Sequence, residues 1–141
     1  MTTPPDGLFP VTQEKASAAF DFVFAPWIKE MGLTDIVVRE GYCSLRLPQN
    51  DRLKFSAGAL CGQALMAAID TAAAMAAATS ERSTKGTTYQ HTHFLRPAKG
   101  DDVIIAAEVK RFGKASAYID CTATFATSGE LVAHAVLEFA F

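Results

Sequence analysis

The segment that most constrains this chain is GALCGQALMAAIDTAAAMAAAT, which runs from Gly58 to Thr79. It consists almost entirely of alanine and other small apolar residues, and it predicts one helix over residues 59–79. A helix that is apolar on every side is typically buried inside a protein, where small side chains allow a neighbouring layer to approach closely. Its only charged residue is Asp70, so we expect a buried central helix that carries one carboxylate.

This segment is also long enough to span a membrane. We expect no membrane association, because alanine is only weakly apolar and no Lys or Arg brackets the segment closely. Asp70 near its midpoint would cost about 2.5–3.5 kcal/mol on an insertion scale. The formal net charge is -2 with no basic cluster, which argues against nucleic acid as a partner.

Cysteine usage and the first residues give an expectation about location. The cysteines are three in number, an odd count that favours reduced thiols over a disulfide framework. Residues 1–10 show neither the basic region nor the apolar run of a signal peptide. We therefore expect a cytoplasmic protein.

The 141 residues predict a single domain over residues 1–141. Several prolines and glycines make residues 1–11 a loose lead-in, followed by an extra helix over residues 12–31 that begins at Thr12 and ends before Gly32. Alternating apolar residues predict strands at residues 35–39, 42–47, 87–95, 102–111, 115–126 and 131–141. Short turns between strands favour antiparallel neighbours. The expected class is α+β, a curved antiparallel sheet wrapped around the central helix.

Two segments carry a resemblance to a known family: GALCGQALMAAIDTAAAMA in the central helix and TTYQHTHFLRPAKGDD after it. Together with the order of elements over residues 35–141, they resemble the hotdog-fold acyl-CoA thioesterases, and within them the phenylacetate-degradation type. The resemblance implies hydrolysis of a small or medium acyl-CoA without metal or organic cofactor. It also implies a homodimer joined through the strand at residues 87–95, or a dimer of two such dimers.

The family pattern places an Asn, then His-Gly-Gly, at the start of the central helix, with an acid eight residues after the first glycine. In this chain the first glycine corresponds to Gly62 and the acid to Asp70. The hydroxyl that begins the next strand corresponds to Thr87, with Thr88 beside it. The apolar-Arg-Pro-Ala step that ends this strand includes Arg96.

Three positions depart from that pattern. Phe55 stands at the Asn position, Cys61 at the His position and Gln63 at the second glycine. The Asn usually orients the catalytic carboxylate or water, so its replacement bears on rate and substrate. Gln63 adds bulk where a thioester carbonyl would approach the backbone, and it shares a helical stripe with Asp70, so it is expected to touch substrate or a partner chain.

Thioester hydrolysis needs an attacking group and a donor for the developing oxyanion. The amide of Gly62 lies in the first helical turn, where N–H groups are unpaired, so it is the expected donor. Asp70 is the expected base or nucleophile, with a pKa raised by burial. Eight residues separate the two along about 12 Å of helix. We therefore expect two antiparallel helices in a homodimer, with each site built from both protomers.

Other residues are candidates for substrate contact. Phe55 and Met66 are expected either to line an acyl pocket or to be ordinary core residues. A coenzyme A phosphate needs cations, and Arg96 together with Gly113-Lys114 is the choice for that contact, against the alternative of ordinary solvated charges.

Cys61 and the histidines of the sequence are also compatible with two other chemistries. Cys61 at a helix start could act as a thiolate nucleophile, but a free cysteine is more often a small buried apolar residue. His91 and His93 alternate on one strand face and could bind zinc, but a third ligand is needed and nothing in the sequence places His134 nearby. No metal is therefore expected.

Two alternatives to hydrolysis share the predicted fold. The first is a non-catalytic hotdog module that binds acyl-CoA or another acyl ligand, which the Phe55 departure keeps open. The second is a hotdog hydratase or dehydratase, which is weaker because no His-containing acid motif begins the helix.

Overall fold

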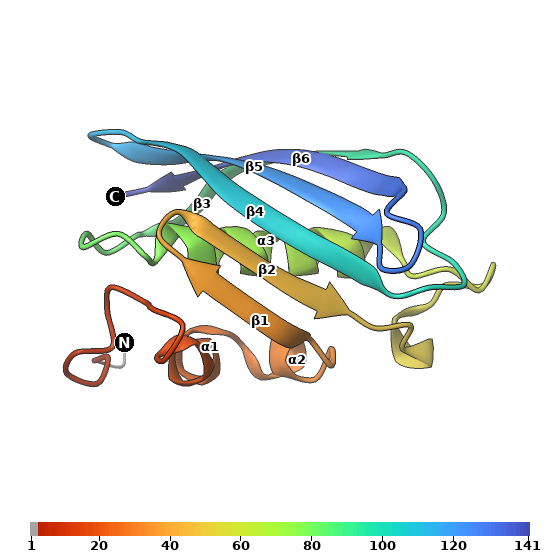
Figure 1. Ribbon diagram of the computed structural model, residues 1–141, viewed down its shortest axis with the longest axis horizontal. Coiled ribbons are helices and arrows are strands. Elements are labelled where there is room, and N and C mark those ends of the chain that lie inside the picture. Colours follow the sequence, from red (N-terminus) through yellow and green to blue (C-terminus); the bar gives the residue numbers. More distant parts are fainter. Residues whose placement is uncertain (1–2) are drawn as a thin grey trace.

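The computed structural model describes residues 3–141 and places six strands in one antiparallel sheet (Figure 1). The strand order across the sheet is β1-β2-β4-β5-β6-β3, so β3 forms one edge although it precedes β4 in the chain. The connection at residues 95–102 carries the chain from that edge back to the middle of the sheet. The strands are β1 (Thr34–Arg39), β2 (Tyr42–Leu47), β3 (Gly86–Phe94), β4 (Val103–Phe112), β5 (Ser116–Phe125) and β6 (Leu131–Ala140).

The core lies between the sheet and the long helix α3 (Gly62–Ala77), which runs along the sheet's inner face (Figure 1). Alternate strand residues such as Leu45, Ile105 and Leu137 are buried against it, as expected for strands with one face covered. On α3 itself, Ala68 and Ile69 are fully buried. The predicted α+β architecture, a curved antiparallel sheet around a central helix, is confirmed.

Helix α3 is shorter than the predicted span of residues 59–79 and begins at Gly62. Leu60 donates its N–H to the carbonyl of Ala98, at 3.0 Å, and so belongs to the loop packing that precedes the helix. No helix within residues 3–141 has the length and apolar character needed to cross a membrane.

The predicted N-terminal helix over residues 12–31 is present but divided, and its single-helix form was wrong. Helix α1 covers Ala16–Val23, with Lys15 rather than Thr12 at its N-cap, and helix α2 covers Pro26–Lys29. The break lies at Ala25, whose extended backbone (ψ 152°) fits the restriction that a following proline imposes. Trp27 on α2 is 58% exposed.

The segment before α1 is held against the rest of the fold. Leu8 and Val11 are buried, and the Val11 N–H donates to the carbonyl of Ala78 at the end of α3, at 2.9 Å. The side chain of Gln13 donates to the Ile36 carbonyl and accepts from the Val38 N–H, which attaches the start of this region to β1. A 3-10 turn, η1 (Asp51–Leu53), lies in the loop between β2 and α3.

Candidate active site

One stripe of α3 is less buried than the rest of the helix. Gln63, Met66, Asp70 and Ala74 lie at spacings of three or four residues, which places them on one helical face. Met66 is 38% exposed, whereas Ala68 and Ala72 on the opposite face are fully covered. The helix therefore has one open face, and its only carboxylate lies on it.

Strand β3 lies beside this stripe and contacts it at three successive points. Thr87 donates a hydrogen bond to Asp70, Gln90 donates through its side-chain amide to the carbonyl of Met66, and the Phe94 ring lies against Gly62. The order of the contacts shows that β3 runs antiparallel to α3. The start of the strand thus meets the middle of the helix, and its end meets the helix N-terminus.

The carboxylate of Asp70 is partly buried and held in one orientation. Its Oδ1 accepts the hydrogen bond from Thr87 Oγ1 at 2.5 Å. Burial raises the pKa of Asp70 above its ordinary value, and the Thr87 hydrogen bond offsets part of this effect because it favours the ionised form. A carboxyl group of raised pKa at an open surface is a candidate general base or nucleophile.

Local strand geometry aims Thr87 at the helix. Thr87 pairs with Phe139 of β6, a buried inward-facing residue, and directly paired residues point to the same face of a sheet. The register then shifts between Thr87 and Tyr89, so Thr88 is the extra residue of a bulge. The Thr88 hydroxyl donates to the Glu138 carbonyl and not to Asp70.

Gly62 is the first residue of α3, and its amide points out of the helix start. The residue before it, Cys61, has extended backbone (φ -69°, ψ 153°) and makes no side-chain capping bond. The first amides of a helix have no intrahelical acceptor, so the Gly62 N–H is available to a ligand oxygen. A Cβ added at Gly62 would lie 3.4 Å from the Phe94 ring. Glycine therefore leaves the most space beside this amide for a ligand.

A cavity of about 410 Å³ opens beside this helix start. Phe55, Phe94 and Leu95 give it apolar walls, and the wall also includes Gly62 and Arg96. The cavity brings together three of the predicted site residues, namely Phe55, Gly62 and Arg96. Its mainly apolar lining suits an apolar ligand.

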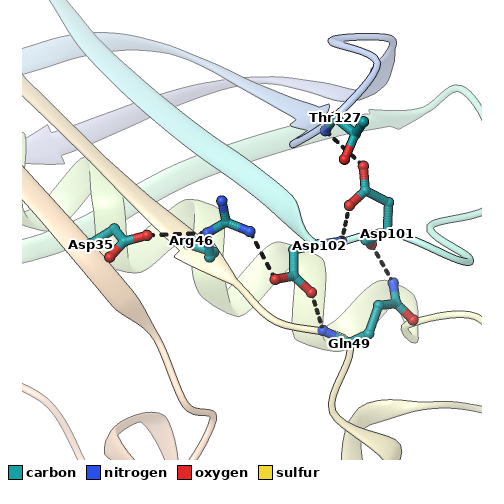
Figure 2. A network of polar contacts seen from close by, with 6 residues as sticks. All are labelled: Asp35, Arg46, Gln49, Asp101, Asp102 and Thr127. Atoms are coloured by element: carbon teal, nitrogen blue, oxygen red, sulfur yellow. Dashed lines mark hydrogen bonds and ion pairs between the residues drawn. The ribbon is translucent and has the colours of Figure 1, made fainter.

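A polar network (Figure 2) holds the loop at residues 98–102, whose first residue, Ala98, lines this cavity. Arg46 on β2 pairs with Asp35 and with Asp102, at 3.1 and 2.8 Å. Asp102 also accepts the Gln49 N–H, and the Gln49 side chain donates to the carbonyls of Ala98 and Asp101. The backbone at residues 98–102 is thereby tied to β2, which holds the cavity wall in place.

The structure does not bring every predicted contact residue to this cavity. The turn at Gly113 and Lys114 lies between β4 and β5, at the opposite end of the molecule from the α3 N-terminus (Figure 1). It is held by Arg82, which donates to the carbonyls of both turn residues. Arg96 borders the cavity, but its guanidinium pairs with Glu130.

The three cysteines fall into two kinds. Cys43 and Cys121 are buried, and burial raises the pKa of each thiol to about 12, so both are inert. Cys61 is half-buried at the start of α3, where its carbonyl accepts the amides of Ala64 and Leu65. Within residues 3–141 its thiol has no hydrogen bond to a histidine, so the arrangement does not favour a thiolate nucleophile.

Sequence reasoning missed the place of His134. Its Cα partner across the β3–β6 pair is His93, so the two imidazoles lie on the same face of the sheet. This neighbour could be found only from the pairing register of β3 with β6. In that register Phe94 pairs with Ala133, and His93 therefore lies opposite His134. Within residues 3–141, however, no three His, Cys, Asp or Glu side chains are grouped so as to hold a metal ion.

Comparison with known proteins assigns the chain to a family. The pattern of the thioesterase superfamily matches residues 57–132. The chain belongs to the thioesterase superfamily. The matched region includes Gly62, Asp70 and Thr87, whereas Phe55 lies two residues before it. No curated protein matches the chain.

Solved structures agree with the hotdog fold expected of a thioesterase superfamily member. Zebrafish thioesterase superfamily member 2 has a TM-score of 0.82 at 20% identity, over 92% of this chain and 98% of that one. PaaI of Escherichia coli, from the phenylacetic acid degradation operon, has a TM-score of 0.76 at 21% identity, over 92% and 95%. A hypothetical thioesterase from Streptococcus pneumoniae, solved with coenzyme A, has a TM-score of 0.70 at 17% identity, over 75% and 83%.

Proposed function

We propose that this thioesterase superfamily member hydrolyses the thioester of a small or medium acyl-CoA. The observation that carries the proposal is the Asp70 carboxylate, which burial gives a raised pKa and which Thr87 holds in one orientation on the open face of α3. The coenzyme A found with the Streptococcus pneumoniae neighbour supports coenzyme A as the carrier.

The site is proposed to form between two protomers. Gly62 and Asp70 lie about 12 Å apart along one helix, too far to share one reacting carbon. Strand β3 pairs with β6 on one side and forms an edge of the sheet on the other, and exposed edges pair readily with another chain. Exposed Phe94 on β3 and the open stripe on α3 support the same surface as the seam. A two-fold axis there would bring the Gly62 amide of one protomer near Asp70 of the other.

In such a site the chemistry divides between the two chains. The thioester carbonyl accepts the Gly62 N–H, and the partial positive charge of the helix N-terminus stabilises the oxyanion as it forms. Asp70 of the partner removes a proton from a water molecule, and the resulting hydroxide adds to the carbonyl carbon. The tetrahedral intermediate then expels the coenzyme A thiolate, which takes up the proton held by Asp70 and restores the carboxylate. Direct attack by the Asp70 carboxylate on the carbonyl is the alternative route.

The remaining contacts follow from the cavity and from the turns. The acyl group is assigned to the cavity beside Phe55, with Met66 on the neighbouring open stripe of α3, and the pantetheine to the seam near Gln63 and Thr88. Arg96 and the Gly113-Lys114 turn are proposed for the coenzyme A phosphates. Since these two regions lie at opposite ends of one chain, each acyl-CoA would contact only one of them on a given protomer.

A second candidate is a non-catalytic module that binds an acyl ligand. It is favoured by the cavity beside Gly62, whose lining residues are mainly apolar and include no carboxylate. In this case the ligand would bind through the Gly62 amide and the aromatic walls without an attacking group.

Turnover of a panel of acyl-CoAs, followed with a thiol-detecting dye, tests the proposal. We expect thiol release by the wild type, loss of release in Asp70→Asn, and full release in Asp21→Asn, a matched control that removes an exposed acid from α1. Sedimentation analysis tests the seam, because a fully active monomer would contradict a two-chain site. Acyl-CoA binding without thiol release would favour the binding module.

A further inference from the structure

Two histidines lie side by side on the outer face of the edge strand β3. His91 and His93 are separated by one residue and are both exposed. Their Nε2 atoms are 2.8 Å apart, and the ring centroids are 4.6 Å apart in an edge-to-face arrangement. One imidazole thus donates to the other, and the contact shows that the two nitrogens approach each other closely in a place that the proposed hydrolysis does not use.

A third histidine lies on the neighbouring strand. His134 of β6 is the direct partner of His93 in the β3–β6 pair, and His91 is two residues along from this pair. Directly paired side chains on one face have Cβ atoms about 4.5–5.5 Å apart, and diagonal neighbours are within reach of long side chains. All three imidazoles thus rise from one small area of the outer sheet face.

This spacing is close to that required by a metal ion. A tetrahedral ion with nitrogen ligands at about 2.0–2.1 Å separates neighbouring nitrogens by about 3.3 Å. Opening the His91–His93 contact from 2.8 Å by a small rotation of each ring gives that separation. Imidazole is a ligand for Zn²⁺, Ni²⁺ and Cu²⁺, and Cu²⁺ binds a given nitrogen site most strongly.

We propose that His91 and His93 chelate a divalent transition-metal ion on the outer face of the sheet, and that His134 supplies a third nitrogen. The three side chains are not preassembled as a ligand group within residues 3–141, so His134 has to change rotamer when the ion binds. His91 and His93 supply the entry point because both are exposed, whereas His134 is half-buried between its neighbours.

The site is separate from the candidate active site. The inward-facing residues of β3, including Thr87 and Phe94, contact α3, whereas His91 and His93 point away from it. Pairing of the β3 edge with a partner uses backbone N–H and C=O groups and leaves the outer face of the strand in place. The inference therefore stands whether or not Asp70 catalyses hydrolysis.

The experiment titrates tag-free protein with Cu²⁺ and with Zn²⁺ by calorimetry, and records the electron paramagnetic resonance spectrum of the Cu²⁺ form. We expect one saturable site per chain with nitrogen hyperfine structure. His91→Asn or His93→Asn should weaken binding by about tenfold or more, since each removes a deprotonated nitrogen ligand. His134→Asn should weaken binding and simplify the nitrogen hyperfine pattern.

Tyr89→Phe is the matched control, because Tyr89 lies on the same strand and the same face two residues before His91. It should bind both ions as the wild type does. Unchanged affinity in His91→Asn or His93→Asn would overturn the proposal, and an unchanged spectrum in His134→Asn would remove the third ligand. Circular dichroism of each variant verifies that the sheet is intact, and unchanged thiol release would confirm independence from the hydrolytic site.

Discussion

The Thr87 hydroxyl donates to the Asp70 carboxylate at 2.5 Å, across the boundary between edge strand β3 and helix α3. This contact joins two residues that are 17 positions apart in the chain and belong to different layers of the fold. It favours the ionised form of a carboxyl group whose pKa burial raises, so the two effects oppose each other at one side chain. Several consequences can be measured.

Replacing Thr87 by Val removes the hydroxyl and keeps the branched shape. The pKa of Asp70 should rise further, because the contact that favours its ionised form is lost. If Asp70 acts as the base, the acidic limb of kcat/KM against pH should move to higher pH. Thr87→Ser, which keeps the hydroxyl, should retain the wild-type profile. If the pH profile of kcat/KM does not change in Thr87→Val, the hydrogen bond does not affect the titration that controls the reaction.

Replacing Asp70 by Asn should have opposite effects on activity and stability. Turnover should fall by about 10²-fold or more, the usual contribution of a positioned base. The free energy of unfolding should rise at pH 7, because the raised folded pKa means that ionised Asp70 opposes folding.

The pH dependence of that stability gain follows from the sign of the shift. Below the unfolded pKa near 3.8, Asp70 is protonated in both states and the variant should have no advantage. The advantage should grow as the pH rises from there to the folded pKa and should stay constant above it. Urea unfolding of both proteins between pH 3 and pH 7 measures the difference, and an Asn variant less stable at pH 7 would contradict the assigned cause.

The sequence predicted those features that depend on periodicity. The alanine-rich segment formed the buried helix, and alternation located all six strands. Helix α3 places Asp70 on its open face with Thr87 beside it, and the catalytic roles that the family resemblance implies for both residues stay predictions. Pro26 was overlooked within an otherwise helical apolar pattern, and its effect on Ala25 divided the first helix.

Other features depend on contacts that no local pattern encodes. The place of His134 opposite His93 results from the pairing of β3 with β6, strands that are not consecutive in the chain. The distance between the Gly113-Lys114 turn and the Gly62 cavity likewise follows from which end of the sheet each turn occupies. Strand pairing decides the first of these features and the direction of each strand in the sheet decides the second, so neither follows from residue type.

Arg46→Gln should weaken the network of Figure 2 in a pH-dependent way. The Gln49 amide and the Arg46 guanidinium lower the pKa of Asp102, so ionised Asp102 stabilises the fold. That stability is present above the unfolded pKa and is lost as the pH falls through the folded pKa. The variant should therefore unfold more easily at pH 7, and the difference should vanish at strongly acidic pH. An equal loss at all pH values would indicate lost packing of the Arg46 side chain instead.

Two glycine substitutions should separate folding from activity. At Gly113 an added Cβ would lie 2.9 Å from the Ser116 carbonyl oxygen, a backbone atom, so Gly113→Ala should cost about 1–3 kcal/mol of stability. At Gly62 the nearest atom is the Phe94 ring at 3.4 Å, an ordinary contact, so Gly62→Ala should fold with nearly the wild-type melting temperature.

The predicted cost of Gly62→Ala lies in turnover. Its methyl group would stand beside the amide that the thioester carbonyl approaches, and a displacement of about 1 Å at a reacting group can cost about 10²-fold in rate. Thermal unfolding and thiol release measured on the same preparations compare the two variants. Full activity in a folded Gly62→Ala protein would show that the carbonyl does not approach this amide. The electrophilic contact would then have to be sought elsewhere on the seam, while the place of Asp70 on the open face of α3 would be unaffected.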